Sequence, residues 1–473
     1  MRMKILCLFL AALLAGCSAV TAEPSEEAGN TPREQEPATP LVAGEVITQA
    51  GTYNLTGGQI LIDAGKDDVV KLVLDGVTLR GETGPAIYAK QCKEVEIILA
   101  EGSVNTVSDS AEYAASDENE PDAAIFVQDS LTISGSGALN VTGNHNHGIR
   151  SQDILTVSGG EVSVTAVGDA LRGRDGVAVK GGRLTLNAGG DGIQSNNADD
   201  DTKGFVNIDG GEITIQAAKD GIQAESSLTV SGGSVTVEGS TEALEASHIY
   251  ITGGKLDLLS TDDAINAAGG DDTGGLFGRM GFGGGDYTVD ISGGEVIFHA
   301  GGDGIDSNGT LNISGGTVFA TINSSADNAA LDSDGETTVT GGTVIAGGTG
   351  TFGNLSSGST ESYVYLTGIR EGDRITVTSG GEELVTYAAD RALAALAIFA
   401  PGIVSGESCE VSVNGAVTSV TAGTGGGFMG GMGGGRGNWG GFGGGQSGDN
   451  RFPEDFSTTP PEGGRERNGP PEL

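Results

Sequence analysis

The chain has 473 residues, of which 85 are glycine and only 5% are aromatic, and its formal net charge is −40. Such an excess of acids argues against nucleic-acid binding, which depends on Lys and Arg neutralising phosphates. Anionic polymers would also be repelled unless a divalent cation lies between them and the protein. Abundant glycine without a collagen triplet, combined with Val, Ile, Leu and Ala, is typical of many tight turns around narrow β cores.

The N-terminus, MRMKILCLFLAALLAGC, is typical of a secretory signal, because basic residues precede an apolar run too short to span a bilayer. Its Leu-Ala-Gly-Cys ending resembles the bacterial lipoprotein lipobox, which implies cleavage before Cys17 and lipidation of Cys17. We therefore predict a protein on the extracellular face of the cell envelope, lipid-anchored to the membrane. An ordinary secretory signal with an incidental cysteine is the alternative. Residues 18–44, rich in Pro and Glu, are predicted to form a disordered tether.

Two cysteines remain beyond the signal peptide and its last residue, Cys92 and Cys409. We expect each to be a small buried apolar side chain, with a disulfide between them as the alternative in an oxidising compartment.

Residues 45–350 repeat a short phrase, seen for example in AGGDGIQSN (188–196) and AGGDGIDSN (300–308). The first position of the repeat holds an acid in most copies: His147, Asp169, Asp191, Asp220, Glu242, Asp263, Asp303 and Ala329. Most copies start 21 or 22 residues apart, and pairs of glycines recur with the same unit. The longer steps indicate insertions, one at NNADDDTKG (196–204) and the largest in a Gly-rich stretch around residues 276–287.

Within each copy, polar and branched apolar residues alternate with period two around a Gly-Gly turn, as in LTVSGGEVSVTA (155–166). Three short strands and three turns in about 22 residues are typical of one coil of a parallel β-helix. We predict an all-β protein whose main domain is a right-handed parallel β-helix. One aliphatic residue per coil should stack inward as a ladder: Ile149, Leu171, Ile193, Ile222, Leu244, Ile265, Ile305 and Leu331.

The recurring acids need a separate explanation, because stacked coils bring like charges within one strand spacing. Each such pair costs about 1 kcal/mol even at high dielectric. Either the carboxylates cap backbone N–H groups of their turns, or calcium bridges them. For the row as a whole we favour calcium, and we predict that Asp191 and Asp220 share one ion that also accepts a uronate carboxylate. The predicted metal ligands are Asp169, Asp191, Asp220, Glu242, Asp263, Asp303 and Asp306.

The residue after each aliphatic should point outward, and it changes from Arg to amide to acid along the chain. Arg side chains pair well with carboxylates, so one end of this row could bind an acidic polymer. A solvated face without function is the alternative. The predicted substrate-binding residues are Arg150, Arg172, Gln194 and Gln223.

Several phrases together resemble bacterial cell-surface parallel β-helix proteins that carry a carbohydrate-binding domain, typified by a clostridial cellulose- and polygalacturonate-binding protein. They include LVLDGVTLRGETGPAIYAK (72–90), EIILAEGSVNTVSD (96–109) and GGDGIDSNGTLNISGG (301–316), and the resemblance covers about residues 51–349. It implies a right-handed β-helix, bound calcium and affinity for acidic plant cell-wall polysaccharide. Its GDGI positions imply metal binding at Asp191, Asp220, Asp263 and Asp303.

Residues 351–422 alternate without the repeat and are predicted to form a β cap over the last coil, whose open edge would otherwise invite aggregation. Only the alanine-rich stretch 388–400 suggests a helix. Residues 423–473, rich in Gly and Pro, are predicted to be disordered.

We predict a monomer that binds polysaccharide without catalysing its cleavage. A pectin-type lyase or hydrolase is the first alternative, because β-helices often carry such sites. A lyase would need a base beside calcium, and the repeat has one basic cluster, formed by His147, Arg150, Arg172, Arg174 and Lys180. A structural spacer or adhesin is the second alternative, because the outer faces are expected to lack the aromatic rings on which sugars stack.

Overall fold

The computed structural model describes residues 39–41, 44–113, 121–269, 286–322, 328–348, 355–356 and 358–424. All of these residues belong to one compact unit. Cys17, the signal peptide, most of the tether, most of the Gly-rich insertion and nearly all of the tail lie outside the described residues. Over the described residues the regular secondary structure is all β, as predicted. No helix in this part of the chain is long and apolar enough to cross a bilayer.

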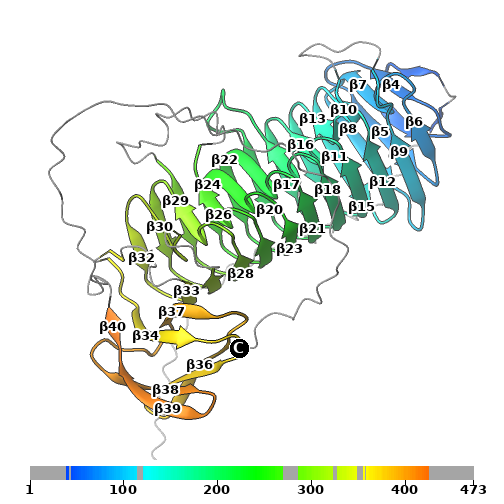
Figure 1. The fold of residues 1–473 in the computed structure, drawn as a ribbon. Helices are drawn as coiled ribbons and strands as arrows, with labels where there is room; N and C mark the ends of the chain where they lie inside the picture. The colour runs from blue at the N-terminus through cyan, green and yellow to red at the C-terminus, as the bar shows by residue number, and fades with distance from the viewer. Residues whose placement is uncertain are drawn as a thin grey trace, which may run out of the picture. The chain divides into compact units, whose positions relative to one another are not determined.

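Most strands run parallel, and most coils contribute strands to three rows that follow one another in register (Figure 1). The first row contains β2 (Val46–Ile47), β4 (Ile60–Asp63), β7 (Ile87–Gln91), β10 (Ala123–Val127), β13 (His147–Ser151), β16 (Leu171–Gly173), β19 (Ile193–Ser195), β26 (Ile265–Ala267) and β29 (Ile305–Ser307). Two long strands, β22 (Ile222–Val230) and β24 (Leu244–Ile251), begin in this row and continue into the second.

The second and third rows complete each coil. The second row contains β1 (Thr39–Pro40), β3 (Gly51–Asn54), β5 (Val69–Leu74), β8 (Glu94–Leu99), β11 (Ser130–Gly135), β14 (Ile154–Val157), β17 (Gly176–Val179), β20 (Phe205–Ile208), β27 (Thr288–Ile291), β30 (Thr310–Ile313) and β32 (Thr337–Val339). The third row contains β6 (Thr78–Arg80), β9 (Val104–Ser108), β12 (Ala138–Gly143), β15 (Glu161–Ala166), β18 (Arg183–Ala188), β21 (Glu212–Ala217), β23 (Ser234–Gly239), β25 (Lys255–Leu259), β28 (Glu295–His299), β31 (Thr317–Thr321) and β33 (Thr343–Gly348). These parallel rows fit a β-solenoid, and its right-handedness stays a prediction.

The predicted inward ladder is confirmed. Ile149 pairs in register with Leu171, and the same column continues through Ile193 and Ile222 to Leu331. Every member of the column is 0% exposed. Burying an aliphatic side chain of this size stabilises the fold by about 1.5–3 kcal/mol, so the ladder is a main part of the core.

The Gly-Gly pairs are explained by the backbone at their second glycine. Gly182, for example, has φ +98°, in the left-handed region that side-chain-bearing residues rarely adopt. A Cβ atom there would also lie 2.9 Å from the carbonyl oxygen of Gly160 on the preceding coil. The turn therefore requires glycine for both its conformation and its close stacking.

Residues 362–424 form antiparallel strands beyond the last coil. They are β34 (Ser362–Ile369), β35 (Arg374–Ser379), β36 (Glu382–Ala388), β37 (Leu393–Phe399), β38 (Ser408–Val413), β39 (Ala416–Thr421) and β40 (Gly423–Thr424). Strand β37 pairs with β33 of the last coil, and Ile297, Phe319 and Ile345 of the third row share an apolar cluster with these strands. The alanine-rich stretch therefore forms a strand, not the helix it suggested, because β33 and β34 flank it on both sides.

Cys92 and Cys409 are buried and free, as expected of small apolar side chains. The alternative of a disulfide between them is wrong.

Candidate functional site

The recurring acids lie just before the first-row strands, and each of the aspartates among them caps the next coil. The Oδ1 atom of Asp169 accepts the backbone N–H of Asp191 at 2.9 Å, and Asp191 accepts that of Asp220 at 3.0 Å. Asp220 does the same for Glu242 at 3.1 Å, and Asp263 for Asp303 at 2.6 Å. Capping and metal binding are thus not exclusive, because the cap uses only one of the two oxygens of each of these aspartates.

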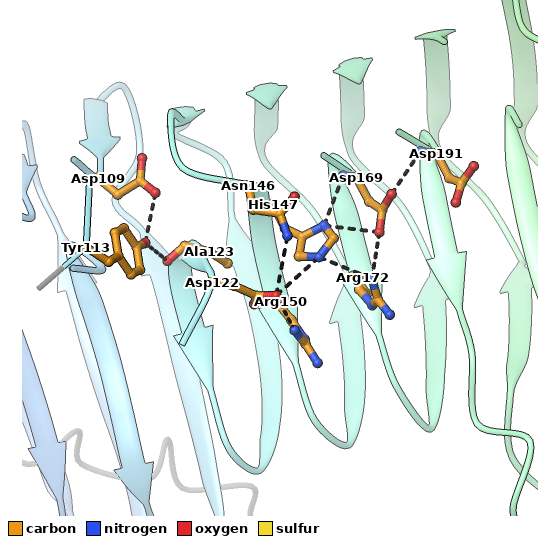
Figure 2. Close-up of polar contacts among 10 residues, drawn as sticks. All are labelled: Asp109, Tyr113, Asp122, Ala123, Asn146, His147, Arg150, Asp169, Arg172 and Asp191. Carbon is orange, nitrogen blue, oxygen red and sulfur yellow. Dashed lines mark hydrogen bonds and ion pairs between the residues drawn. The ribbon is translucent and has the colours of Figure 1, made fainter. Parts of the chain in front are cut away.

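The first coil of this series has a histidine where the next coils have Asp169 and Asp191 (Figure 2). His147 Nδ1 lies 3.0 Å from the backbone nitrogen of Asp169 and 3.1 Å from its Oδ2 atom. On the other side, Nε2 lies 3.4 Å from Oδ2 of Asp122. The imidazole is only 5% exposed, so two carboxylates and an amide surround a buried ring.

Two arginines complete this cluster, which we call the His147 cluster: Asp122, His147, Arg150, Asp169 and Arg172. Arg150 Nη1 lies 2.5 Å from Asp122 Oδ2, and Arg172 Nη1 lies 3.1 Å from both Asp169 Oδ2 and His147 Nε2. Burial alone would raise the pKa of Asp122, but His147 and Arg150 lower it to about 2. Burial alone would lower the pKa of His147, but hydrogen bonds and charges of Asp122 and Asp169 raise it overall.

This pairing argues against Asp169 as a metal ligand. Burial alone would raise the pKa of Asp169, yet His147 and Arg172 lower it overall, so the carboxylate is ionised and already neutralised. A further cation would be repelled by the guanidinium of Arg172 at 3.1 Å. Sequence reasoning did not pair His147 and Arg172 with Asp169, and it missed Asp122, which lies outside the recurring position.

The pKa of His147 predicts a pH dependence of stability. Because its folded-state pKa is raised above the unfolded value of about 6.5, its stabilisation is full below that pH. The stabilisation is then lost as the pH rises through the folded-state pKa. We expect the melting temperature of the wild type, at fixed calcium, to fall toward that of His147→Gln as the pH is raised above 6.5. A constant difference between the two proteins from pH 6 to 9 would contradict this prediction.

Farther along the row, acids gather in two groups, which we call the acid triads. Asp220, Glu242 and Glu245 form the first, and Asp263, Asp303 and Asp306 form the second. Within each triad, one carboxylate oxygen per residue lies within 4.8 Å of the others. Five of the predicted metal ligands are therefore brought together in two places on consecutive coils.

Crowding and burial raise the pKa values of the triads. Burial, with the charges of Asp220 and Asp263, raises the pKa of Glu242 to about 8 despite its hydrogen bonds to Asn266. Burial and the charge of Asp303 raise the pKa of Asp263 to about 7. A hard cation would relieve this repulsion, and carboxylate oxygens are the ligands that calcium prefers. The residues present thus fit a calcium ion.

Asp191 lies outside both triads. Its Oδ1 atom caps Asp220, and its Oδ2 atom accepts a hydrogen bond from Gln194 Nε2 at 2.6 Å. The geometry therefore does not support an ion shared by Asp191 and Asp220. Glu245 takes the third place beside Asp220. Sequence reasoning left Glu245 out, although it occupies the same outward position as Asp306. The signal that could have found it is an acid at both the recurring position and the outward position of one copy, as in Glu242 and Glu245.

The outward residues form a continuous column in the first row. Arg150 pairs in register with Arg172, Arg172 with Gln194, and Gln194 with Gln223. We call Arg150, Arg172, Gln194, Gln223 and Asn266 the Arg–amide row. Glu245 of the first acid triad lies between Gln223 and Asn266 in the same column. Its members hold five of the ten buried side-chain polar atoms that lack a hydrogen-bond partner among the described residues: Arg150 Nε, Arg172 Nε, Gln194 Oε1, Gln223 Oε1 and Asn266 Oδ1.

The expectation that the outer faces lack aromatic rings is wrong. Half-buried Tyr88 and fully buried Phe126 precede Arg150 in the same column. Their ring centroids are 5.9 Å apart, and the Arg150 guanidinium lies 5.5 Å from the Phe126 centroid. The sequence scatters these rings over separate coils, so only the register shows that they are neighbours.

The family of carbohydrate-binding domain-containing proteins matches residues 44–280, which is half of the chain. The chain belongs to this family. A relative of the same description from Acetivibrio thermocellus is 40% identical over 126 residues, covering 25% of this chain and 44% of the relative. The match thus spans less than half of the relative's length. A solved structure, that of a polysaccharide lyase-like protein from C. thermocellum in a gadolinium derivative, has a TM-score of 0.40 and 35% identity, covering 45% of this chain and 83% of that one.

Proposed function

We propose that this carbohydrate-binding protein binds an acidic, polygalacturonate-like polysaccharide along its first row, with calcium as cofactor. The observation that carries the proposal is the Arg–amide row. Each of its five side chains keeps one polar atom buried without a partner among the described residues, which costs about 1–3 kcal/mol per group. A ligand that draws these side chains into hydrogen bonds would recover that energy. Hydroxyl and carboxylate groups of a uronate polymer offer the required donors and acceptors.

The arginine end gives the row its preference for acidic sugars. Arg150 and Arg172 are adjacent in register, and their side chains are only 15% and 18% exposed. Their neighbours Asp122 and Asp169 neutralise two positive charges, and His147 adds a third when it is protonated. The His147 cluster then carries a net positive charge in a protein that is otherwise strongly acidic. It is therefore a place where a polymer carboxylate is attracted.

Calcium extends the same surface at its acidic end. Asp220, Glu242 and Glu245 would hold one ion, and Asp263, Asp303 and Asp306 another, through oxygens that are not used as caps. Calcium accepts six to eight oxygen ligands, so three carboxylates leave positions for sugar oxygens. When bound, the ion supplies positive charge that attracts the carboxylates of an acidic polymer.

Cleavage of the polymer is not part of the proposal. A lyase needs a base that reaches the sugar, but His147 is 5% exposed and lies between two carboxylates. Arg150 and Arg172 are likewise paired with acids. We expect no unsaturated product in the ultraviolet spectrum when polygalacturonate is incubated with protein and calcium. Release of such product would establish the lyase alternative.

The direct test of function is a glycan array probed with and without a calcium chelator. We expect polygalacturonate and related uronates to bind in calcium and to lose binding in chelator. A protein that binds no uronate in calcium would contradict the proposal.

Attachment to the membrane through Cys17 is a further part of the proposal, supported by the lipobox-like sequence. We expect Cys17→Ser to move the protein from the membrane fraction into the soluble fraction without changing its circular dichroism. A variant that stays in the membrane fraction after a high-salt wash would rule out the lipid anchor.

A further inference from the structure

A ring lies flat on the outer face of the second row. Phe205 of β20 pairs in register with Gly176 of β17. A Cβ atom at Gly176 would lie 2.4–2.7 Å from three atoms of the Phe205 ring, so the ring covers the glycine backbone. Phe205 is half-buried and is not part of the inner core. One face of the ring thus rests on the coil, which leaves the other to face outward.

Two coils farther on, the same column presents a pair of rings. Phe205 pairs with Ser227, and Ser227 pairs with His248 of β24. His248 and Tyr250, two residues apart on one strand, point to the same side, with ring centroids 6.4 Å apart and planes inclined by 23°. Both are half-buried and lie outside the inner core. The small Ser227 lies between Phe205 and His248 in this column, so no large side chain separates the Phe205 ring from the other two rings.

The groups around the His248 and Tyr250 rings are hydroxyls, an amide and a carboxylate. Thr288 lies beside His248 and Asp290 beside Tyr250 on the next coil, and Asn312 donates to Asp290 at 2.8 Å. None of these neighbouring positions holds Lys or Arg. Such groups bond well to sugar hydroxyls, while the carboxylate repels an acidic polymer. This surface therefore differs in charge from the Arg–amide row, which has Arg150 and Arg172.

We propose that Phe205, His248 and Tyr250 form a second carbohydrate site, which stacks the pyranose rings of an uncharged polysaccharide. The His248 and Tyr250 planes are inclined by only 23°, and all three rings are half-buried, so apolar ring surface is available to the C–H faces of sugars at little cost in side-chain entropy. Coils are about 4.8 Å apart, so Phe205 and His248 lie about 10 Å apart along the row, and a chain laid along the solenoid meets both. The proposal rests on the carbohydrate-binding function but places this ligand on a different face.

The test is calorimetric titration of the full-length protein with cellohexaose, xylohexaose and mannohexaose. We expect at least one of them to bind the wild type, and the double variant Phe205→Ala/Tyr250→Ala to bind it about tenfold more weakly or not at all. Polygalacturonate binding in calcium should be unchanged in that variant. Phe205→Tyr/Tyr250→Phe keeps both rings and should keep binding. Leu259→Ala, an exposed apolar position on the third row, is the matched control.

Three results would overturn the proposal: no hexasaccharide binds the wild type, the double alanine variant retains full affinity, or the ring-preserving variant loses it while remaining folded. The experiment distinguishes failure of this proposal from failure of the first-row proposal. Arg150→Gln/Arg172→Gln should lose polygalacturonate and keep the hexasaccharide. A wild type that binds a hexasaccharide through these rings but no uronate would contradict the first-row proposal and support this one.

Discussion

Replacing Asp263, Asp303 and Asp306 together with Asn should abolish most of the stabilisation that calcium gives the protein. Asn keeps the side-chain oxygen that caps the next coil at Asp263 and Asp303, so the backbone contacts persist. It removes three formal charges from the second acid triad, which weakens binding of a hard cation. A ligand bound only by the folded state contributes about 2.7 kcal/mol at a hundredfold excess over its Kd. We expect the triple variant to lose much of the stabilisation that calcium at this site gives the folded state.

The measurement is the melting temperature in calcium and in chelator, for the wild type, the triple variant and Asp191→Asn. Asp191 is the matched control, because it caps Asp220 in the same way but lies outside both triads. The control should keep the full rise in melting temperature that calcium gives the wild type. If Asp191→Asn loses as much as the triple variant, or if chelator leaves the wild type unchanged, the triads are not calcium sites and serve as caps only.

Replacing Arg150 and Arg172 with Gln should weaken polygalacturonate binding by about two to four orders of magnitude. Hydrogen bonds to charged groups contribute about 1.5–3 kcal/mol each, and both positions lose their charge. Gln keeps part of the side-chain length, so Asp122 and Asp169 retain a donor in reach while the His147 cluster loses its positive charge. The calcium increment in melting temperature should remain, since neither residue lies in a triad.

Arg183→Gln is the control for this prediction. Arg183 is an exposed residue of the third row that pairs with Glu212, so its loss removes one positive charge, half of what the double variant removes, without touching the first row. It should bind polygalacturonate as the wild type does, apart from a small effect of overall charge. Equal losses in the control and in the double variant would mean that net charge, and not the Arg–amide row, determines binding.

The sequence predicted those features that depend on one repeated position. The ladder from Ile149 to Leu331 follows from the repeat itself, because a residue at a fixed place in each coil must stack on its copies. The order of Arg150, Arg172, Gln194 and Gln223 in one outward column follows for the same reason.

What the sequence could not show depends on neighbours outside the repeated position. Asp122 reaches His147 and Arg150 from the preceding coil, and nothing in its own sequence context marks that contact. Phe205 follows an insertion, and its place over Gly176 depends on how the two strands pair after that insertion. The helix suggested by the alanine-rich stretch failed similarly, because pairing of β37 with β33 and β34 overrides the preference of alanine.

The most direct test of the account is calorimetric titration of the wild-type protein with an oligogalacturonate and with the same oligomer after methyl esterification, each in calcium and in chelator. We expect saturable binding of the free acid in calcium, and loss of most affinity when either the carboxylate charge or the calcium is removed. Equal affinity for the esterified oligomer, or full affinity in chelator, would contradict the claim that arginines and calcium-loaded acid triads of the first row together bind an acidic polysaccharide.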